Sequence, residues 1–195
     1  MKRAGDGLLG RVTRRDIMIF ALAAGAAVTH SGAAGAATAT AIDRSVDDGL
    51  ARLRTQGPKT RALMQKAVGI LMFPRIIKGG LIVGGQYGDG ALRAGGKTAG
   101  YYNIAAASFG LQIGGESFSY ALLLMNQGAL DYLQKSDGWA LGSGPSVVVM
   151  DKGAATSLDT TTINQDVVAI PFGLHGLMAS ASIEGSKITH ITPSA

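Results

Sequence analysis

Glycine-rich segments dominate the chain after Pro74 and exclude a helical fold there. Residues 79–90 read Gly-Gly-Leu-Ile-Val-Gly-Gly-Gln-Tyr-Gly-Asp-Gly, and each glycine lowers helix stability by about 1 kcal/mol relative to alanine. The segment 80–86 recurs at 110–116, and 176–181 is a looser third copy. Two or three copies at uneven spacing do not make a solenoid. We therefore interpret them as strands of one sheet that meet the same packing constraint.

Glycine inside a strand weakens it unless the missing side chain leaves space that something needs. Closely crossing strands, the bends of a small barrel, or a helix lying on the sheet would each need that space. A ligand backbone or an acyl chain lying against the strands would need it too. The packing explanation is favoured, and the ligand explanation stays open.

The segment before the glycines has a helical pattern. Ile42, Val46, Leu50 and Leu53 form one apolar stripe between charged residues, which predicts an amphipathic helix from Ile42. Gly57-Pro58 ends this helix and starts another, which continues from Thr60 and ends near Gly69. Two N-terminal helices are therefore expected.

The rest of the chain is predicted to consist mainly of short strands. Asn126 is a good helix N-cap, and Leu130, Tyr132 and Leu133 fit a short helix that ends at Gly138. Residues 101–109 are extended or a loop, and residues 92–97 predict the end of a strand and a Gly95-Gly96 turn. Besides the glycine-rich copies, strands are expected at 70–73, 146–150, 167–170, 177–183 and 187–191. The predicted fold class is α+β: a β-rich core, as an antiparallel sheet, a sandwich or a small barrel, with two N-terminal helices and one internal helix.

Residues 1–41 have the order of an export signal. A basic stretch precedes an uncharged run of about 12 residues from Ile17 to Val28, which is shorter than the roughly 20 residues that span a bilayer. Ala-x-Ala sequences follow, so cleavage is expected near Ala39 or Ala41. The pair Arg14-Arg15 favours a twin-arginine signal over an ordinary Sec signal. Residues 42–195 would then be one exported domain.

Most of the net charge of +5 belongs to this segment. Residues 42–195 keep 13 Lys or Arg and 11 Asp or Glu, a net charge of +2. So small a charge and an export signal disfavour nucleic acid as a partner. The chain has no Cys, which excludes disulfides, thiolate metal sites and cysteine catalysis.

The sequence contains no recognisable catalytic set. Residues 91–98 end like a phosphate-binding loop, but Ala91 stands where that motif needs glycine. His175 and His190 lack carboxylates at metal-ligand spacing, and Asp47-Asp48 is expected to be a solvated pair on a helix. No serine lies in a nucleophile elbow. We expect neither an enzyme nor a bound metal or cofactor.

One basic stretch does suggest a function. Five cations lie within twenty residues with no acid between them, interleaved with apolar residues: Lys59, Arg61, Lys66, Arg75 and Lys78. A cationic helix beside an apolar segment is typical of proteins that bind an anionic membrane surface. The alternative is a core-packed helix with ordinary charges on its wet side.

Several ordered blocks resemble the SYLF lipid-binding family, over about residues 66–188. They are Ala67–Pro74, Lys78–Gly90, Ser108–Glu116, Leu123–Asn126 and Gly176–Gly185. The resemblance implies a β-rich core with flanking helices and the binding of phospholipid, including phosphoinositides in eukaryotic relatives. It also implies membrane contact through an N-terminal basic amphipathic segment. By position, the residues that would make this contact are the five cations named above.

These observations lead to two main hypotheses. The first is a non-enzymatic periplasmic or secreted domain that binds anionic phospholipid, or a membrane surface, through its N-terminal basic helices. The alternative is a structural or protein-interaction domain of the envelope, with an envelope protein as partner and no lipid ligand.

Overall fold

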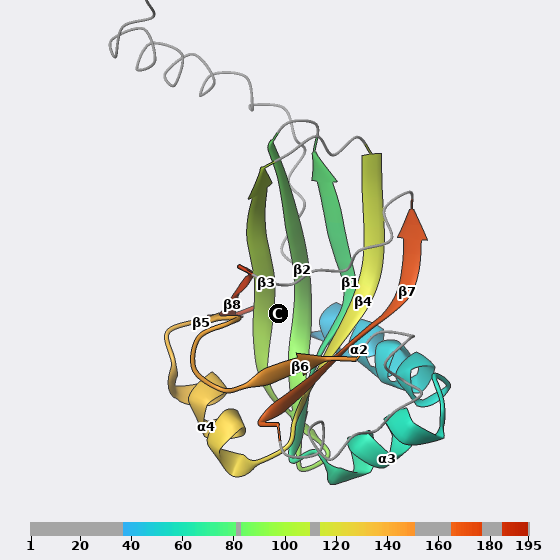
Figure 1. Ribbon diagram of the computed structural model, residues 1–195, viewed down its shortest axis with the longest axis vertical. Helices are drawn as coiled ribbons and strands as arrows, with labels where there is room; N and C mark the ends of the chain where they lie inside the picture. Colours follow the sequence, from blue (N-terminus) through green and yellow to red (C-terminus); the bar gives the residue numbers. More distant parts are fainter. Residues whose placement is uncertain (1–36, 81–82, 110–113, 151–164, 177–184, 195) are drawn as a thin grey trace, which may run out of the picture. The chain divides into compact units, whose positions relative to one another are not determined.

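A computed structural model describes residues 37–80, 83–109, 114–150, 165–176 and 185–194. Within this part of the chain there are three helices and eight strands, with the labels of Figure 1. The helices are α2 (Ala39–Arg54), α3 (Pro58–Lys66) and α4 (Gln127–Lys135). The strands are β1 (Gly69–Gly80), β2 (Val83–Ala94), β3 (Lys97–Phe109), β4 (Gly114–Leu124), β5 (Trp139–Ala140), β6 (Val147–Val149), β7 (Val167–Gly176) and β8 (Lys187–Ile191).

All eight strands form a single curled sheet in the order β5-β8-β3-β2-β1-β4-β7-β6 (Figure 1). Every neighbouring pair is antiparallel except β6 and β7, which are parallel. The predicted α+β class with a β-rich core, two N-terminal helices and one internal helix is confirmed. Of the three arrangements that the sequence left open, the protein adopts one sheet curled into a half-barrel.

Several predicted boundaries differ from the observed ones. Helix α2 begins at Ala39, three residues before the apolar stripe, because the Thr38 side chain caps it by accepting a hydrogen bond from the Ala41 amide at 3.2 Å. Strand β7 continues past Pro171 to Gly176, whereas the prediction ended at residue 170. Strand β6 pairs only with residues 167–169, so Pro171 lies where β7 has become an edge strand. The strand expected at 177–183 lies outside the described residues.

The two faces of the sheet each carry a hydrophobic core. Helices α2 and α3 cover one face, where the buried stripe Ile42, Val46, Leu50 and Leu53 packs on residues such as Met72. We call this the helix-covered face. The other face, the inner face, packs against α4 and the fully buried Trp139. Residues 120–124 of β4 point alternately to the two cores, so this part of the strand is a continuous apolar run.

A bulge in β1 interrupts this alternation. The pairing of β1 with β4 shifts register between Phe73 and Ile76, and both of these residues lie in the inner core. Pro74 and Arg75 lie opposite the single residue Ser119, so β1 contains one extra residue here, and Arg75 is exposed. A bulge of this kind reverses which face the following residues occupy. Simple alternation from Met72 would place Ile76 on the helix-covered face, but Ile76 lies in the inner core. The residues of β1 that follow Arg75 are therefore on the opposite face from the one that simple alternation predicts.

The described parts of the first two glycine-rich copies, in β2 and β4, lie on either side of the end of β1. Gly79 and Gly80 of β1 are in register with Gly85 and Gly84 of β2, and with Gly115 and Gly114 of β4. Close packing explains other glycines of β2: a Cβ on Gly90 would overlap the Met72 carbonyl oxygen, beside the bulge. The packing explanation therefore holds at Gly90, whereas a Cβ on Gly115 would have nothing within 4 Å.

Candidate functional site: a basic helix and an adjacent groove

Three of the five predicted cations lie on α3. Gly57 has a φ of 143°, and Pro58 begins the helix, where its missing N–H is not needed. Leu63 and Thr60 are buried against the domain, which leaves Arg61 and Lys66 exposed and Lys59 half-buried. Residues 58–66 contain no acid. In the described part of the chain, none of the three cations forms an ion pair.

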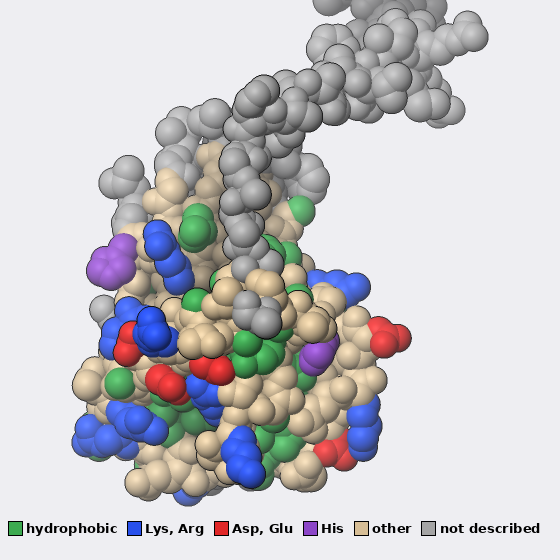
Figure 2. Space-filling view, turned by 180° about the vertical axis from the view of Figure 1, so that it is seen from behind, with side chains coloured by type: hydrophobic (Ala, Val, Ile, Leu, Met, Phe, Trp, Pro, Cys, Tyr) green, Lys and Arg blue, Asp and Glu red, His purple; other side chains and the backbone are tan. Residues whose placement is uncertain are grey.

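The structure adds a fourth cation that the sequence prediction missed. The Arg61 guanidinium donates a hydrogen bond to the Arg54 carbonyl oxygen at 3.3 Å, so the last turn of α2 adjoins α3. Arg54 is exposed there. We call Arg54, Lys59, Arg61 and Lys66 the α3 basic surface. Helix α3 lies at the lower right of Figure 1. Figure 2 shows the molecule from behind, so the same region lies at the lower left, and Lys and Arg side chains gather there.

Arg75 and Lys78 do not belong to this surface. The bulge turns Arg75 outward on the helix-covered side of the sheet. It turns Lys78 to the inner face, where the residue is only 9 % exposed. The prediction that all five cations share one membrane-facing surface is therefore corrected for Lys78. The physical reason is the extra residue in β1, which shifts the strand alternation by one.

Lys78 belongs to a buried polar cluster on the inner face. It is in register with Gln86 on one side and with Glu116 on the other, and the Gln86 amide donates a hydrogen bond to the Ser186 hydroxyl at 2.6 Å. Glu116 is 3 % exposed, and neither of its carboxylate oxygens has a hydrogen-bond partner among the residues that the structure describes. Burial raises the pKa of Glu116, and the charge of Lys78 partly opposes that rise.

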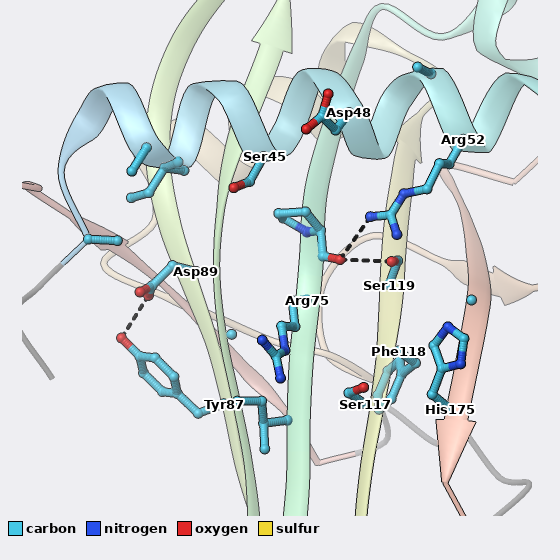
Figure 3. Close-up of a pocket in the computed structure, with 18 residues that line it drawn as sticks. Ser45, Asp48, Arg52, Arg75, Tyr87, Asp89, Ser117, Phe118, Ser119 and His175 are labelled. Atoms are coloured by element: carbon cyan, nitrogen blue, oxygen red, sulfur yellow. Dashed lines mark hydrogen bonds between the residues drawn. The ribbon is translucent and has the colours of Figure 1, made fainter.

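A groove of about 950 Å³ runs between α2 and the sheet, on the helix-covered side (Figure 3). Its polar lining comes from five elements, α2, β1, β2, β4 and β7. The polar residues that line it are Ser45, Asp48, Arg52, Arg75, Tyr87, Asp89, Ser117, Ser119 and His175. Arg75 lies between Tyr87 and His175, with Arg52 on the far side from Asp89. None of the α3 residues lines the groove.

Some of the polar groups in the groove are already engaged. The Tyr87 hydroxyl donates to Asp89 at 2.7 Å, which raises the pKa of Tyr87 above its usual value. The Ser119 hydroxyl and the Arg52 guanidinium both donate to the Pro74 carbonyl oxygen, at 2.8 and 3.4 Å. Within the described residues, Arg75 has no hydrogen-bond or ion-pair partner.

A polar network fixes α2 above the groove. Arg93 of β2 forms ion pairs with Asp43 at 2.9 Å and with Asp47 at 2.8 Å. The hydroxyls of Thr98 and Tyr101 also donate to Asp43, at 2.8 and 2.9 Å. Both residues of the predicted solvated pair Asp47-Asp48 are exposed on α2. Asp47 also pairs with Arg93 of β2, and Asp48 lines the groove.

Other kinds of site find little support in the described part of the chain. It contains no group of three or more His, Cys, Asp or Glu side chains that could hold a metal ion. Nor does any described helix have the length and hydropathy needed to cross a membrane.

Comparison with known families decides the assignment. Residues 105–192 match the family model described as Ysc84, Las17-binding protein actin regulator. This part of the chain matches the Ysc84 (SYLF) family. The match covers the end of β3 and all of β4 to β8, and it confirms the family that the sequence blocks suggested. A search of the curated proteins found no match. The α3 basic surface and Arg75 lie before the matched region, whereas Ser117 and His175 lie within it.

Proposed function

We propose that this protein is a non-enzymatic domain that binds the surface of anionic phospholipid membranes through the α3 basic surface. The observation that carries the proposal is a group of four cations, none of which forms an ion pair with an acid among the described residues. Lys59, Arg61 and Lys66 come from about two acid-free turns of helix, and the fold adds Arg54.

The expected strength follows from the number of cations. A basic residue held near an anionic bilayer contributes about 1 kcal/mol. Four such residues would contribute about 4 kcal/mol, or roughly a thousandfold in partitioning. The attraction decays within about 10 Å at 0.1 M salt, so binding should weaken as salt is added.

Flotation with vesicles tests this proposal. The full-length protein is mixed with vesicles of phosphatidylcholine alone, or of phosphatidylcholine with 30 % phosphatidylglycerol, at two salt concentrations. Binding to the anionic vesicles only is expected, and the triple variant Lys59→Gln, Arg61→Gln, Lys66→Gln should lose it.

A matched control removes the same charge elsewhere. The variant Arg44→Gln, Lys97→Gln, Lys187→Gln also removes three exposed cations, but they lie on α2, β3 and β8. It should float almost like the unmodified protein. Equal binding to neutral and anionic vesicles, or equal loss in both triple variants, would overturn the proposal and favour the protein-interaction alternative.

The proposed location is the periplasm or the cell exterior, after removal of the N-terminal segment. The order of basic stretch, apolar run and small residues in 1–41 supports this location. Two contacts of residues 38 and 39 support a cleavage site before them. Thr38 caps α2, and the Ala39 amide donates to the Ser194 carbonyl oxygen at 3.1 Å. Cleavage at Ala39 or Ala41 would remove these contacts, so we favour cleavage at or before Ala37.

A further inference from the structure

The groove beside α2 combines apolar walls with one free cation. Ala41 and Ile42 of α2 line one side, and Ile77 of β1 lines the other. Ile77 is 55 % exposed and Tyr87 is 51 % exposed, so the domain leaves apolar surface open next to polar groups. A concave site lined by apolar residues with a few fixed polar groups is the usual form of a small-molecule site.

Arg75 is the group in the groove that most needs a partner. The bulge at Pro74–Arg75 places its guanidinium in the middle of the groove (Figure 3). Arg52 donates to a backbone carbonyl and Arg93 is held by two carboxylates, but Arg75 has no such contact within the described residues. A guanidinium presents a planar set of donors that suits phosphate and carboxylate oxygens.

The neighbours of Arg75 fit an anion better than a cation. Ser117 and His175 lie on its β4 and β7 side (Figure 3), and both can donate hydrogen bonds. Asp89 accepts a hydrogen bond from Tyr87 at the far end of the groove, and Asp48 lies on α2, one helical turn before Arg52. The polar groups on the β4 and β7 side of Arg75 are therefore the hydrogen-bond donors Ser117 and His175.

From this arrangement we propose that the groove binds a single anionic phospholipid molecule. Its phosphate contacts Arg75, with Ser117 and His175 beside it, and the first part of an acyl chain lies against Ile77 and Ile42. A volume of about 950 Å³ is at the upper end for small-molecule sites, enough for a headgroup and part of a chain. The inference rests on the proposed function in its class of ligand, but it uses different residues from the α3 basic surface.

Titration with soluble lipids tests the site without a membrane. Dihexanoyl phosphatidylglycerol, below its micelle concentration, is added to the full-length protein and binding is followed by calorimetry. Dihexanoyl phosphatidylcholine, inorganic phosphate and hexanoate are titrated in parallel. Saturable binding of the phosphatidylglycerol is expected, with at least tenfold weaker binding of the other three probes.

Variants then assign the binding to the groove. Arg75→Gln keeps most of the side-chain length and should weaken phosphatidylglycerol binding about tenfold or more, because a charge-assisted hydrogen bond is lost. Ile77→Ser should weaken it through the apolar wall. Arg44→Gln removes an exposed cation of α2 that does not line the groove, and it should bind normally. Thermal unfolding of each variant establishes that it is folded.

The outcomes separate this inference from the membrane-surface proposal. Arg75→Gln should lose soluble-lipid binding and still float with anionic vesicles, whereas the α3 triple variant should do the reverse. Unchanged affinity in a folded Arg75→Gln variant would overturn the groove proposal while leaving the vesicle result intact. Equal binding of inorganic phosphate would show a free-anion site, and equal binding of phosphatidylcholine would show no charge preference. Either result would overturn the assignment to an anionic phospholipid.

Discussion

Gly90 and Gly115 offer a matched test of why the sheet contains so much glycine. Both lie inside strands, and alanine at either position adds one methyl group. At Gly90 that methyl would overlap the Met72 carbonyl oxygen and lie 2.7 Å from Cδ1 of Phe73. Met72 and Phe73 are fully buried, so neither side chain can move into solvent. At Gly115 the methyl would meet nothing within 4 Å.

The expected difference between the two variants is large. Overpacking a buried position lowers the free energy of unfolding by about 1–3 kcal/mol. The upper end applies to Gly90→Ala because the nearest atoms belong to the backbone of β1, so we expect a loss of about 3 kcal/mol. For a domain of this size that is about 6–12 °C in Tm. Gly115→Ala should instead be neutral or gain about 0.5 kcal/mol, since alanine restricts the unfolded chain.

Circular dichroism followed during thermal and urea unfolding measures both variants. Gly90→Ala should melt well below the unmodified protein, and Gly115→Ala at or slightly above it. If the two variants have the same Tm, close packing between β1 and β2 is not the reason for Gly90, and the register assigned around the bulge is wrong. Vesicle flotation of Gly115→Ala would then test whether this glycine contributes to membrane binding instead.

Three other predictions follow from the polar contacts and from the N-terminal segment. Arg93→Ala removes both ion pairs that hold α2 to β2, so hydrogen exchange in α2 should quicken, with a loss of about 1–2 kcal/mol in unfolding free energy; unchanged exchange would contradict the docking role. Because burial raises the pKa of Glu116 in the folded state, the protein should lose stability as the pH rises from the ordinary pKa of 4.5 to the raised value. In a plot of the urea unfolding midpoint against pH, Glu116→Gln should remove this fall in stability. The same slope in the variant and in the unmodified protein would contradict the raised pKa of Glu116. Replacing Arg14 and Arg15 by Lys should block export if the signal is of the twin-arginine type, and continued export would favour the Sec signal. Mass spectrometry of the exported unmodified protein should find an N-terminus at or before Thr38.

Local patterns were enough to predict much of the architecture. The apolar stripe of α2, the Gly57-Pro58 break and the Asn126 cap each depend on neighbours within a few residues, and each was predicted correctly. The Asn126 side chain accepts a hydrogen bond from the Ala129 amide at 2.9 Å, as its sequence position indicated. The glycine-rich copies predicted strands of one sheet, and their described parts are in register there.

The candidate sites were less predictable because they depend on contacts between distant segments. Arg54 joins the α3 basic surface only because α2 and α3 meet, and no spacing rule links it to Lys66. The groove needs α2 to lie over β1 and β4, which Arg93 fixes from fifty residues away. No residue of the groove was predicted as part of a shared cavity.

The sequence by itself determined the α+β class, the three helices and an acid-free basic helix. Composition and short-range periodicity carry that information, and both act within a few residues. Only the tertiary structure decided which cations could act together. One extra residue in β1, at Pro74–Arg75, directs Arg75 into the groove and buries Lys78 on the inner face. A bulge depends on how β1 pairs with β2 and β4, because strand alternation is set by register between strands and not by the strand's own residues.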